Sequence, residues 1–375
     1  GVNDAPNHSA VMTRQNATAW GYAGGTLPFY TLVPSLTIRA IGQSYPVVNS
    51  DVVITATLRM STDLPKDSKI TITGLTGTQT PDSAGLGAST DLILYSNVGF
   101  SAFNNRPVWT QSTGTLVFTA KEELPLSTTS YTVSFTLKSP ATAQASPAVS
   151  MSGSLECGTN DAPMAVVAGD KPGTALLGVP GGADPLYIVV PTFTTRYVVQ
   201  NNPLASQRNN ISVTFETNVN LAHADASTIT LSGFTGAVAA DGGTSVRLRD
   251  FQVNANYSLE GDLLFDGANA GYGRFAGGSL VLTVATGKTL LSGQVYTFWF
   301  TVTNPRHIMT TPNVQFSAAG TATYLPQSVT STTAAVLGTS GWGVPGTVVC
   351  PAGYYAPAEQ GAMANCTLCY RGSYS

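Results

Sequence analysis

Side chains that could take part in catalysis are few and scattered. The three histidines, His8, His223 and His307, stand apart from any serine or cysteine at the spacing of a known nucleophile motif. Residues 271–276 match the dinucleotide pattern G-x-G-x-x-A, but that pattern works only between a strand and a helix whose N-terminus holds the pyrophosphate. The residues that follow, 280–284, alternate as a strand does. We therefore expect no nucleotide site, no cofactor and no enzyme activity.

Acidic side chains gather in one stretch of the second half of the chain, between residues 239 and 270. Carboxylate oxygens are ligands of calcium, and loops at one end of a β-sandwich can bring several of them together. A solvated polar loop has the same composition, so both interpretations remain open. The carboxylates in this stretch are Asp241, Asp250, Glu260, Asp262 and Asp266.

The composition favours an extracellular protein over a cytosolic enzyme. Hydrophobic residues make up 43% of the chain and charged residues only 10%, against about 25% charged residues in ordinary soluble domains. The formal net charge is -3 and no run of Lys or Arg occurs, which argues against a nucleic-acid or membrane-surface partner. No apolar run approaches the ~20 residues of a membrane-spanning helix. The chain also lacks an initiating Met and a signal peptide, as expected of a segment whose targeting sequence has been removed.

The chain contains an internal repeat. The run YTVSFTLKSP at residues 131–140 returns as YTFWFTVTNP at 296–305, and NDAP at 3–6 returns at 160–163. The offset between the copies grows from 157 to 165 residues, as happens when surface loops accept insertions. Self-similarity over this length predicts two tandem domains.

Short apolar runs within each copy alternate with period two, as half-buried strands require. Residues 52–58 and 131–137 show this in the first copy, and 211–215 and 296–302 show it in the second. About seven such runs per copy are typical of an immunoglobulin-like sandwich. We therefore predict an all-β protein with two tandem antiparallel Ig-like β-sandwiches, extended leader segments and a small disulfide-rich C-terminal module.

The expected boundaries are 1–30 for a leader, 31–156 for the first sandwich, 157–186 for a leader or linker, 187–330 for the second sandwich, 331–349 for a linker and 350–375 for the cysteine-rich module.

The leader segments admit two interpretations, because they far exceed the median connection of about 4–6 residues. One is a flexible linker. The other is an arm that docks on a neighbouring domain or subunit, since apolar side chains such as Trp20, Tyr22 and Phe29 gain nothing in a solvated linker. Residues 30–33 and 187–190 are rich enough in β-branched and aromatic side chains to add a strand to an exposed sheet edge.

Trp299 is a further candidate for an interface. It lies on the face of its strand opposite Tyr296 and Phe298. A large apolar side chain on the outward face indicates a contact with a sugar, a neighbouring subunit or the second sheet.

The last stretch of the chain carries CPAGYY from Cys350, CTLC from Cys366 to Cys369, and GSYS at the end. It resembles the ephrin-receptor-like cysteine-rich repeat of secreted and cell-surface eukaryotic proteins. The resemblance implies disulfides, a spacer role and an oxidising compartment. In that family another repeat usually follows, so we expect the module to be incomplete and the chain to come from a longer precursor.

Four cysteines allow three pairings. With the resemblance in view we favour a bridge between Cys350 and Cys366, which leaves Cys157 and Cys369 to pair with each other or with cysteines elsewhere. A zinc site at Cys366 and Cys369 is disfavoured, because a structural site needs four ligands and His307 is the nearest histidine.

Phrases such as VPSLTIR and WTQSTGTLVFT are similar to repeats in large surface proteins of algae and other protists, including the flagellar hairs called mastigonemes. That resemblance implies an architecture and no functional residues. Acceptor motifs for N-glycosylation fit a secreted protein and occur at Asn7, Asn16, Asn210, Asn256 and Asn365.

The sequence thus predicts a structural extracellular glycoprotein, a subunit of a filament, flagellar hair or cell coat that self-assembles into a polymer through sandwich edges and leader segments. The alternative is a carbohydrate-binding adhesin or receptor ectodomain.

Overall fold

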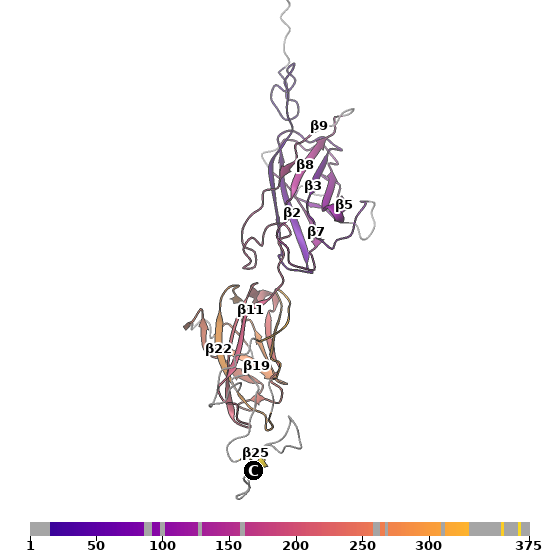
Figure 1. Cartoon of the computed structure of the whole chain (residues 1–375). Coiled ribbons are helices and arrows are strands. Elements are labelled where there is room, and N and C mark those ends of the chain that lie inside the picture. Colours follow the sequence, from indigo (N-terminus) through magenta and orange to yellow (C-terminus); the bar gives the residue numbers. More distant parts are fainter. Residues whose placement is uncertain are drawn as a thin grey trace, which may run out of the picture. The chain divides into compact units, whose positions relative to one another are not determined.

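The computed structural model describes residues 16–85, 92–97, 102–126, 130–157, 162–257, 263–266, 269–308, 312–329, 354–355 and 367–368. The chain divides into two compact units, each built of antiparallel sheets (Figure 1). Unit 1 comprises Gly1–Leu176 with Pro180–Val189, and unit 2 comprises Leu177–Val179 with Val190–Ser375. No α-helix occurs in the described ranges, so none of those residues forms a helix that could cross a membrane. The predicted all-β class, with two antiparallel sandwiches, is confirmed.

Two sheets form the sandwich of unit 1. The first has the order β1-β2-β7-β4, with β1 Leu36–Gln43, β2 Asp51–Met60, β7 Tyr131–Lys138 and β4 Tyr95–Ser96. The second has the order β10-β8-β3-β6-β5, with β10 Val167–Ala168, β8 Ser150–Leu155, β3 Lys69–Thr73, β6 Thr115–Thr119 and β5 Val108–Thr110, while β9 Ala162–Pro163 also pairs with β8.

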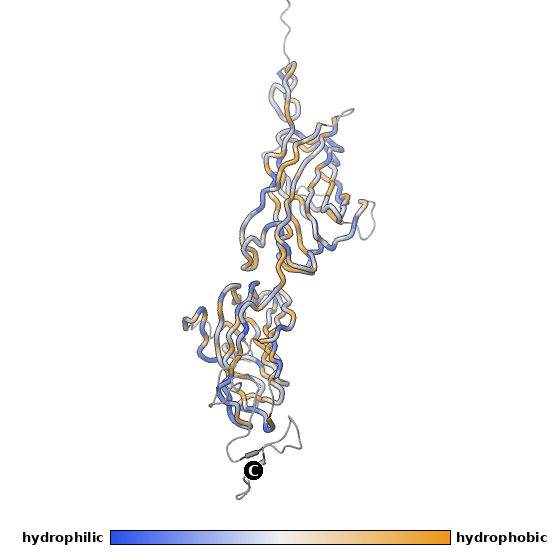
Figure 2. Tube along the Cα trace, viewed as in Figure 1, coloured by the Kyte–Doolittle hydropathy of each residue, from blue (hydrophilic) through white to orange (hydrophobic). Residues whose placement is uncertain are grey.

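The core of unit 1 follows directly from the alternation in the sequence. Along β2 every second side chain is buried, from Val52 to Met60, and along β7 the buried face runs from Tyr131 to Leu137. Figure 2 shows hydrophobic residues (orange) interspersed with hydrophilic residues (blue) along the trace of both units. Phe103 packs edge-on against Phe118 at 5.2 Å between ring centroids. Burial of these faces is the main stabilising term of the sandwich.

Unit 2 repeats this plan. One sheet has the order β11-β12-β22-β17-β18, with β11 Phe193–Gln200, β12 Arg208–Thr217, β22 Tyr296–Thr303, β17 Arg249–Val253 and β18 Asn256–Tyr257, and β15 Val238–Ala239 also pairs with β22. The other has the order β16-β19-β20-β14-β23-β24, with β16 Ser245–Arg247, β19 Tyr272–Ala276, β20 Ser279–Thr283, β14 Thr228–Ser232, β23 Gln315–Ala319 and β24 Tyr324–Ser328. The minor pairs are β13 Leu221–Ala222 with β21 Thr289–Leu290, and β25 Tyr354–Tyr355 with β26 Thr367–Leu368.

The two units match in register as well as in strand order. Leu58 faces Tyr131 in unit 1, and the corresponding Phe215 faces Tyr296 in unit 2. Each tyrosine hydroxyl donates to a backbone carbonyl five or six residues earlier in the chain. Burial raises the pKa of both tyrosines, so both stay protonated at neutral pH and keep these bonds. The internal repeat in the sequence is therefore a structural repeat.

Candidate docking site

Residues 162–176 and 180–189, most of which were expected to form a leader or linker, belong to unit 1 and contact its sandwich. Both β9 and β10 pair with β8, the strand that ends the first copy. The side chain of Met164 is buried between them, and its N–H donates to the carbonyl of Gly153 at 2.7 Å. The edge of this sheet, which would otherwise expose unpaired backbone groups, is covered by the chain itself.

Arg39 on β1 holds the next part of this segment. Its Nε donates to the carbonyl of Ala168 at 2.8 Å, and its guanidinium lies 3.3 Å from a carboxylate oxygen of Asp170. The backbone N–H of Ile41 donates to the Asp170 carbonyl, and the N–H of Asp170 donates to the Arg39 carbonyl, both at 2.9 Å. Because both charged side chains are partly exposed, the ion pair contributes little. The backbone bonds hold the segment in register.

The side-chain amide of Gln43, at the end of β1, forms hydrogen bonds with residues 182–187. Its Nε2 donates to the carbonyls of Gly182 and Tyr187, and its Oε1 accepts the N–H of Leu186, all at 2.8 Å. One amide thus satisfies three backbone groups of a segment that lies about 140 residues later in the sequence.

Gln144 holds the same segment from a second direction. Its backbone exchanges two hydrogen bonds with Ile188, both at 2.9 Å, and its Nε2 donates to the Leu186 carbonyl at 3.0 Å. Val189 in turn donates to the Pro46 carbonyl at 2.8 Å. We call Leu186–Val189 the docking segment, and we call its acceptor site the group Gln43, Pro46–Val48, Gln144 and Ser146.

The side chains of the docking segment complete the core of unit 1. Leu186 is 0% exposed and Ile188 is 1% exposed, and both belong to the same hydrophobic cluster as the strands. Leu186 also has a positive φ of 53°, which is unfavourable for a branched residue and persists only where its surroundings hold it. Met164 and residues 182–189 are thus packed on unit 1, whereas residues 171–175 are exposed. The solvated-linker interpretation does not hold for residues 182–189.

Gln43 gives a direct test of the acceptor site. We expect Gln43→Leu to destabilise the docking of residues 182–189 by about 2–4 kcal/mol, because three backbone groups lose their partner in a partly buried place. Limited proteolysis should then cut near residues 180–190 faster than in the wild type. Asn97→Leu, which removes an amide bonded to the Ser130 carbonyl and to the Thr132 N–H, is the control and should leave that cleavage rate unchanged.

The first leader adopts the same backbone as the second, at an offset of 157 residues. Thr26 donates to the carbonyl of Ala17, as Ala183 donates to the carbonyl of Thr174. Tyr30 donates to Leu27, as Tyr187 donates to Asp184. The positive φ angles also correspond: Trp20 57° and Leu177 52°, Gly21 79° and Gly178 76°, Gly24 75° and Gly181 67°, Phe29 63° and Leu186 53°.

Each leader is fixed to the sandwich that follows it in sequence by an equivalent residue. In unit 1 the N–H of Asp63 donates to the Trp20 carbonyl, and in unit 2 the N–H of Asn220 donates to the Leu177 carbonyl. The next residue is glycine in both cases. A Cβ at Gly21 would lie 2.5 Å from Leu126 Cβ, and one at Gly178 would lie 2.2 Å from Asn220 Oδ1, so neither position admits a side chain.

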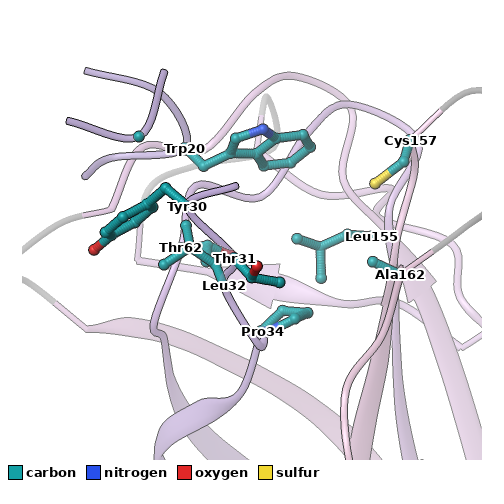
Figure 3. Close-up of a pocket in the computed structure, with 10 residues that line it drawn as sticks. Trp20, Tyr30, Thr31, Leu32, Pro34, Thr62, Leu155, Cys157 and Ala162 are labelled. Atoms are coloured by element: carbon teal, nitrogen blue, oxygen red, sulfur yellow. The ribbon is translucent and has the colours of Figure 1, made fainter. Parts of the chain in front are cut away.

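The counterparts of the two buried residues of the docking segment are exposed in the first leader. Phe29, the counterpart of the fully buried Leu186, is 102% exposed, and Thr31, the counterpart of Ile188, is also exposed. Beside them a hollow of about 260 Å³ is lined by Trp20, Gly25, Tyr30, Thr31, Leu32, Pro34, Thr62, Leu155, Cys157 and Ala162. Figure 3 shows Trp20 over this hollow, with the sulfur of Cys157 turned toward it.

The residues that line the hollow are mostly apolar. They carry no carboxylate, imidazole or amine, and Tyr30 and Cys157 contribute a phenol hydroxyl and a thiol. The buried hydroxyl of Thr62 has no hydrogen-bond partner among the described residues. Such a surface fits an apolar segment with one polar group to satisfy.

The predicted interface residues have different environments. Trp20, which lines the hollow, and Phe29 are both exposed. Tyr22 is half-buried, and its ring centroid lies 6.5 Å from that of Tyr30. Trp299 is covered within unit 2: Arg249 lies over its ring at 5.5 Å, and its Nε1 donates to Asp250 at 2.5 Å. Trp299 therefore contacts its own chain.

The structure does not bring the described carboxylates together as a calcium site. Asp241 pairs with Arg208 at 3.1 Å, Asp250 accepts from Trp299, and Asp266 is exposed on a separate loop. Among the described residues no three Asp, Glu, His or Cys side chains could hold a metal ion. Glu260 and Asp262 lie outside the described residues.

Only some of the cysteines and N-glycosylation motifs lie among the described residues. Cys157 is exposed and unpaired, and the described residues hold no second cysteine. The favoured bridge between Cys350 and Cys366 lies outside them, as do Cys369, Asn7 and Asn365. Asn16 and Asn256 are exposed. Asn210 is half-buried in β12, where its Oδ1 accepts from Thr301 Oγ1 at 2.8 Å.

A signal for the leaders was present in the sequence. The hexapeptide WGYAGG at residues 20–25 corresponds to LGVPGG at 177–182, and WGVPGT at 342–347 is a third occurrence. The glycines share φ angles in the first two. The third occurrence lies outside the described residues.

Comparisons with known proteins give only loose likenesses. No protein-family model and no curated protein matches the chain. Among solved structures, it is similar to the C-terminal domain of the AgI/II polypeptide BspA of Streptococcus agalactiae, at 10% identity and a TM-score of 0.38, over 79% of this chain and 97% of that one. It is also similar to the collagen-binding domain of the surface protein RspB of Erysipelothrix rhusiopathiae, at 10% identity and a TM-score of 0.20, over 79% and 93%. Likenesses this weak carry no argument about function.

Proposed function

We propose that this chain is a structural extracellular glycoprotein, a subunit of a filament, flagellar hair or cell coat. The observation that supports this most strongly is the docking of residues 186–189 on the sandwich of unit 1, through Gln43, Gln144 and Pro46. A contact between a leader and the sandwich before it is heterologous, and heterologous contacts that do not close build linear assemblies.

The surface chemistry is consistent with that role. Only 10% of residues are charged, and the chain carries five Asn-x-Ser/Thr acceptor motifs. The resemblance of the C-terminal stretch to ephrin-receptor-like repeats, and of the sandwiches to protist surface proteins, supports a secreted location.

A carbohydrate-binding adhesin or receptor ectodomain is the alternative, and one observation favours it. The hollow beside Trp20 is open and carries an aromatic side chain that could stack on a sugar. Saturable binding of the chain to members of a glycan array, abolished by Trp20→Ala, would support that alternative.

Glycosylation gives a residue-level prediction. When the chain is produced in secretory cells, we expect Asn256→Gln to lower the mass by one N-glycan, because Asn256 is exposed where β17 turns into β18. Asn210→Gln should leave the mass unchanged, because Asn210 lies in the central strand β12 with its amide oxygen engaged. Mass spectrometry of the intact variants measures the glycan lost at each site. Equal mass losses from the two substitutions would contradict the prediction that only the exposed Asn256 is glycosylated.

Immunogold electron microscopy of source cells tests the structural role itself. Antibodies raised against the chain should label ordered filaments or a coat at regular spacing. Label on scattered single molecules, together with sugar binding, would overturn the proposal in favour of the adhesin.

A further inference from the structure

We propose that Phe29–Val33 is a second docking segment, and that its partner is the acceptor site of another sandwich of this same repeat. This inference rests on the proposed function, because it names the contact through which repeats would be joined.

The first support is the backbone. Leader 1 has the same turns and the same positive φ angles as leader 2. Phe29 keeps a φ of 63° with its side chain fully exposed. Two hydrogen bonds hold the turn, from the Tyr30 N–H to the Leu27 carbonyl and from the Thr31 hydroxyl to the Phe29 carbonyl. The segment therefore has the shape of a docked segment before it docks.

The second support is the chemistry of the side chains. The sequence FYTLV at residues 29–33 aligns with LYIVV at 186–190. Phe29 takes the place of Leu186 in the floor of the site, and Thr31 takes the place of Ile188. Phe29 at 102% and Val33 at 81% are the two most exposed large hydrophobic side chains among the described residues of unit 1, and Trp20 at 40% and Tyr30 at 45% are also exposed. Exposed apolar side chains close together in one segment mark an interaction surface.

The third support is the nature of the acceptor. The site in unit 1 recognises the docking segment mainly through its backbone: the amides of Gln43 and Gln144 bond to main-chain groups of Gly182, Leu186 and Tyr187. Main-chain bonds of this kind can form with any segment of the same backbone shape, while the two buried positions, Leu186 and Ile188, select the side chains that fit. A segment with the same shape and an apolar residue at the Leu186 position fits such a site.

The test uses the full chain with its own docking segment weakened. In Leu186→Asp the acceptor site is left without its apolar anchor. We expect a fluorescent peptide of residues 24–36 to bind this variant saturably, as a peptide of residues 181–193 does, and to bind the wild-type chain at least tenfold more weakly. The same peptide with Phe29→Asp should also bind at least tenfold more weakly, because a buried carboxylate is strongly unfavourable. Absence of saturable binding of the 24–36 peptide to the variant would overturn the inference.

A second variant decides the matter if Leu186→Asp fails to fold. The triple change Leu186→Phe, Ile188→Thr and Val189→Leu places the side chains of leader 1 in the acceptor site of unit 1. We expect amides of residues 182–190 to keep their protection from hydrogen exchange within about tenfold of the wild type. Protection lost to the level of an unfolded segment would overturn the inference. Failure here leaves the immunogold result untouched, so the two proposals are distinguishable.

Discussion

Leu186→Asp is expected to destabilise unit 1 by about 4 kcal/mol or more. Removal of a buried leucine alone costs roughly 3–5 kcal/mol, and a carboxylate in the same place adds a desolvation term. Leu186 is 0% exposed and lies in the core cluster of unit 1. A loss of this size lowers the melting temperature of a unit this large by about 10 °C. Calorimetry measures it.

Phe29→Asp is the matched control, because Phe29 is the repeat-equivalent residue and is fully exposed. It should leave the melting temperature of unit 1 unchanged. Equal shifts from the two substitutions would show that the docking segment does not belong to the core.

Phe215→Ala is expected to destabilise unit 2 by about 3–5 kcal/mol. Its ring is 0% exposed and contacts the rings of Phe193, Tyr296, Phe298 and Phe316, with centroid distances from 5.3 to 6.5 Å. Truncation leaves a cavity that surrounding aromatic side chains cannot fill without leaving their preferred rotamers.

The counterpart of Phe215 in the first copy is Leu58, which is 1% exposed. Leu58→Ala should lower the melting temperature of unit 1, and Phe215→Ala should lower that of unit 2. The fragments that limited proteolysis releases at each melting transition show which unit has unfolded. A Phe215→Ala protein that melts as the wild type does would contradict the aromatic core described here.

The strands and cores could be predicted because their information is local. Val52, Ile54, Ala56 and Leu58 alternate in the sequence and are buried together. The internal repeat then carried the same prediction to unit 2. Period two fixes which face of a strand is apolar, and burial follows from that.

The docking of residues 182–189 could not be chosen over a linker from the sequence, because its determinants are distant. The side chain of Gln43 contacts residues 139 to 144 positions away, and an isolated glutamine gives no pattern. The environment of Trp299 could not be predicted for the same reason, because Arg249 and Asp250, which contact it, lie about 50 residues earlier in the chain. The similarity of WGYAGG at 20–25 to LGVPGG at 177–182 is visible in the sequence, but only the φ angles show that the two segments share a backbone conformation.

Hydrogen exchange of the unmodified chain tests the central claim most directly, since the two leaders have one backbone shape and opposite environments. The amides of Leu186, Ile188 and Val189 donate to Gln43, Gln144 and Pro46. We expect them to exchange at least 100-fold more slowly than the equivalent amides of Phe29, Thr31 and Leu32. A free energy of opening of about 2.7 kcal/mol slows exchange by that factor. Equal and fast exchange in both segments would show that residues 186–189 are not docked and would contradict the account.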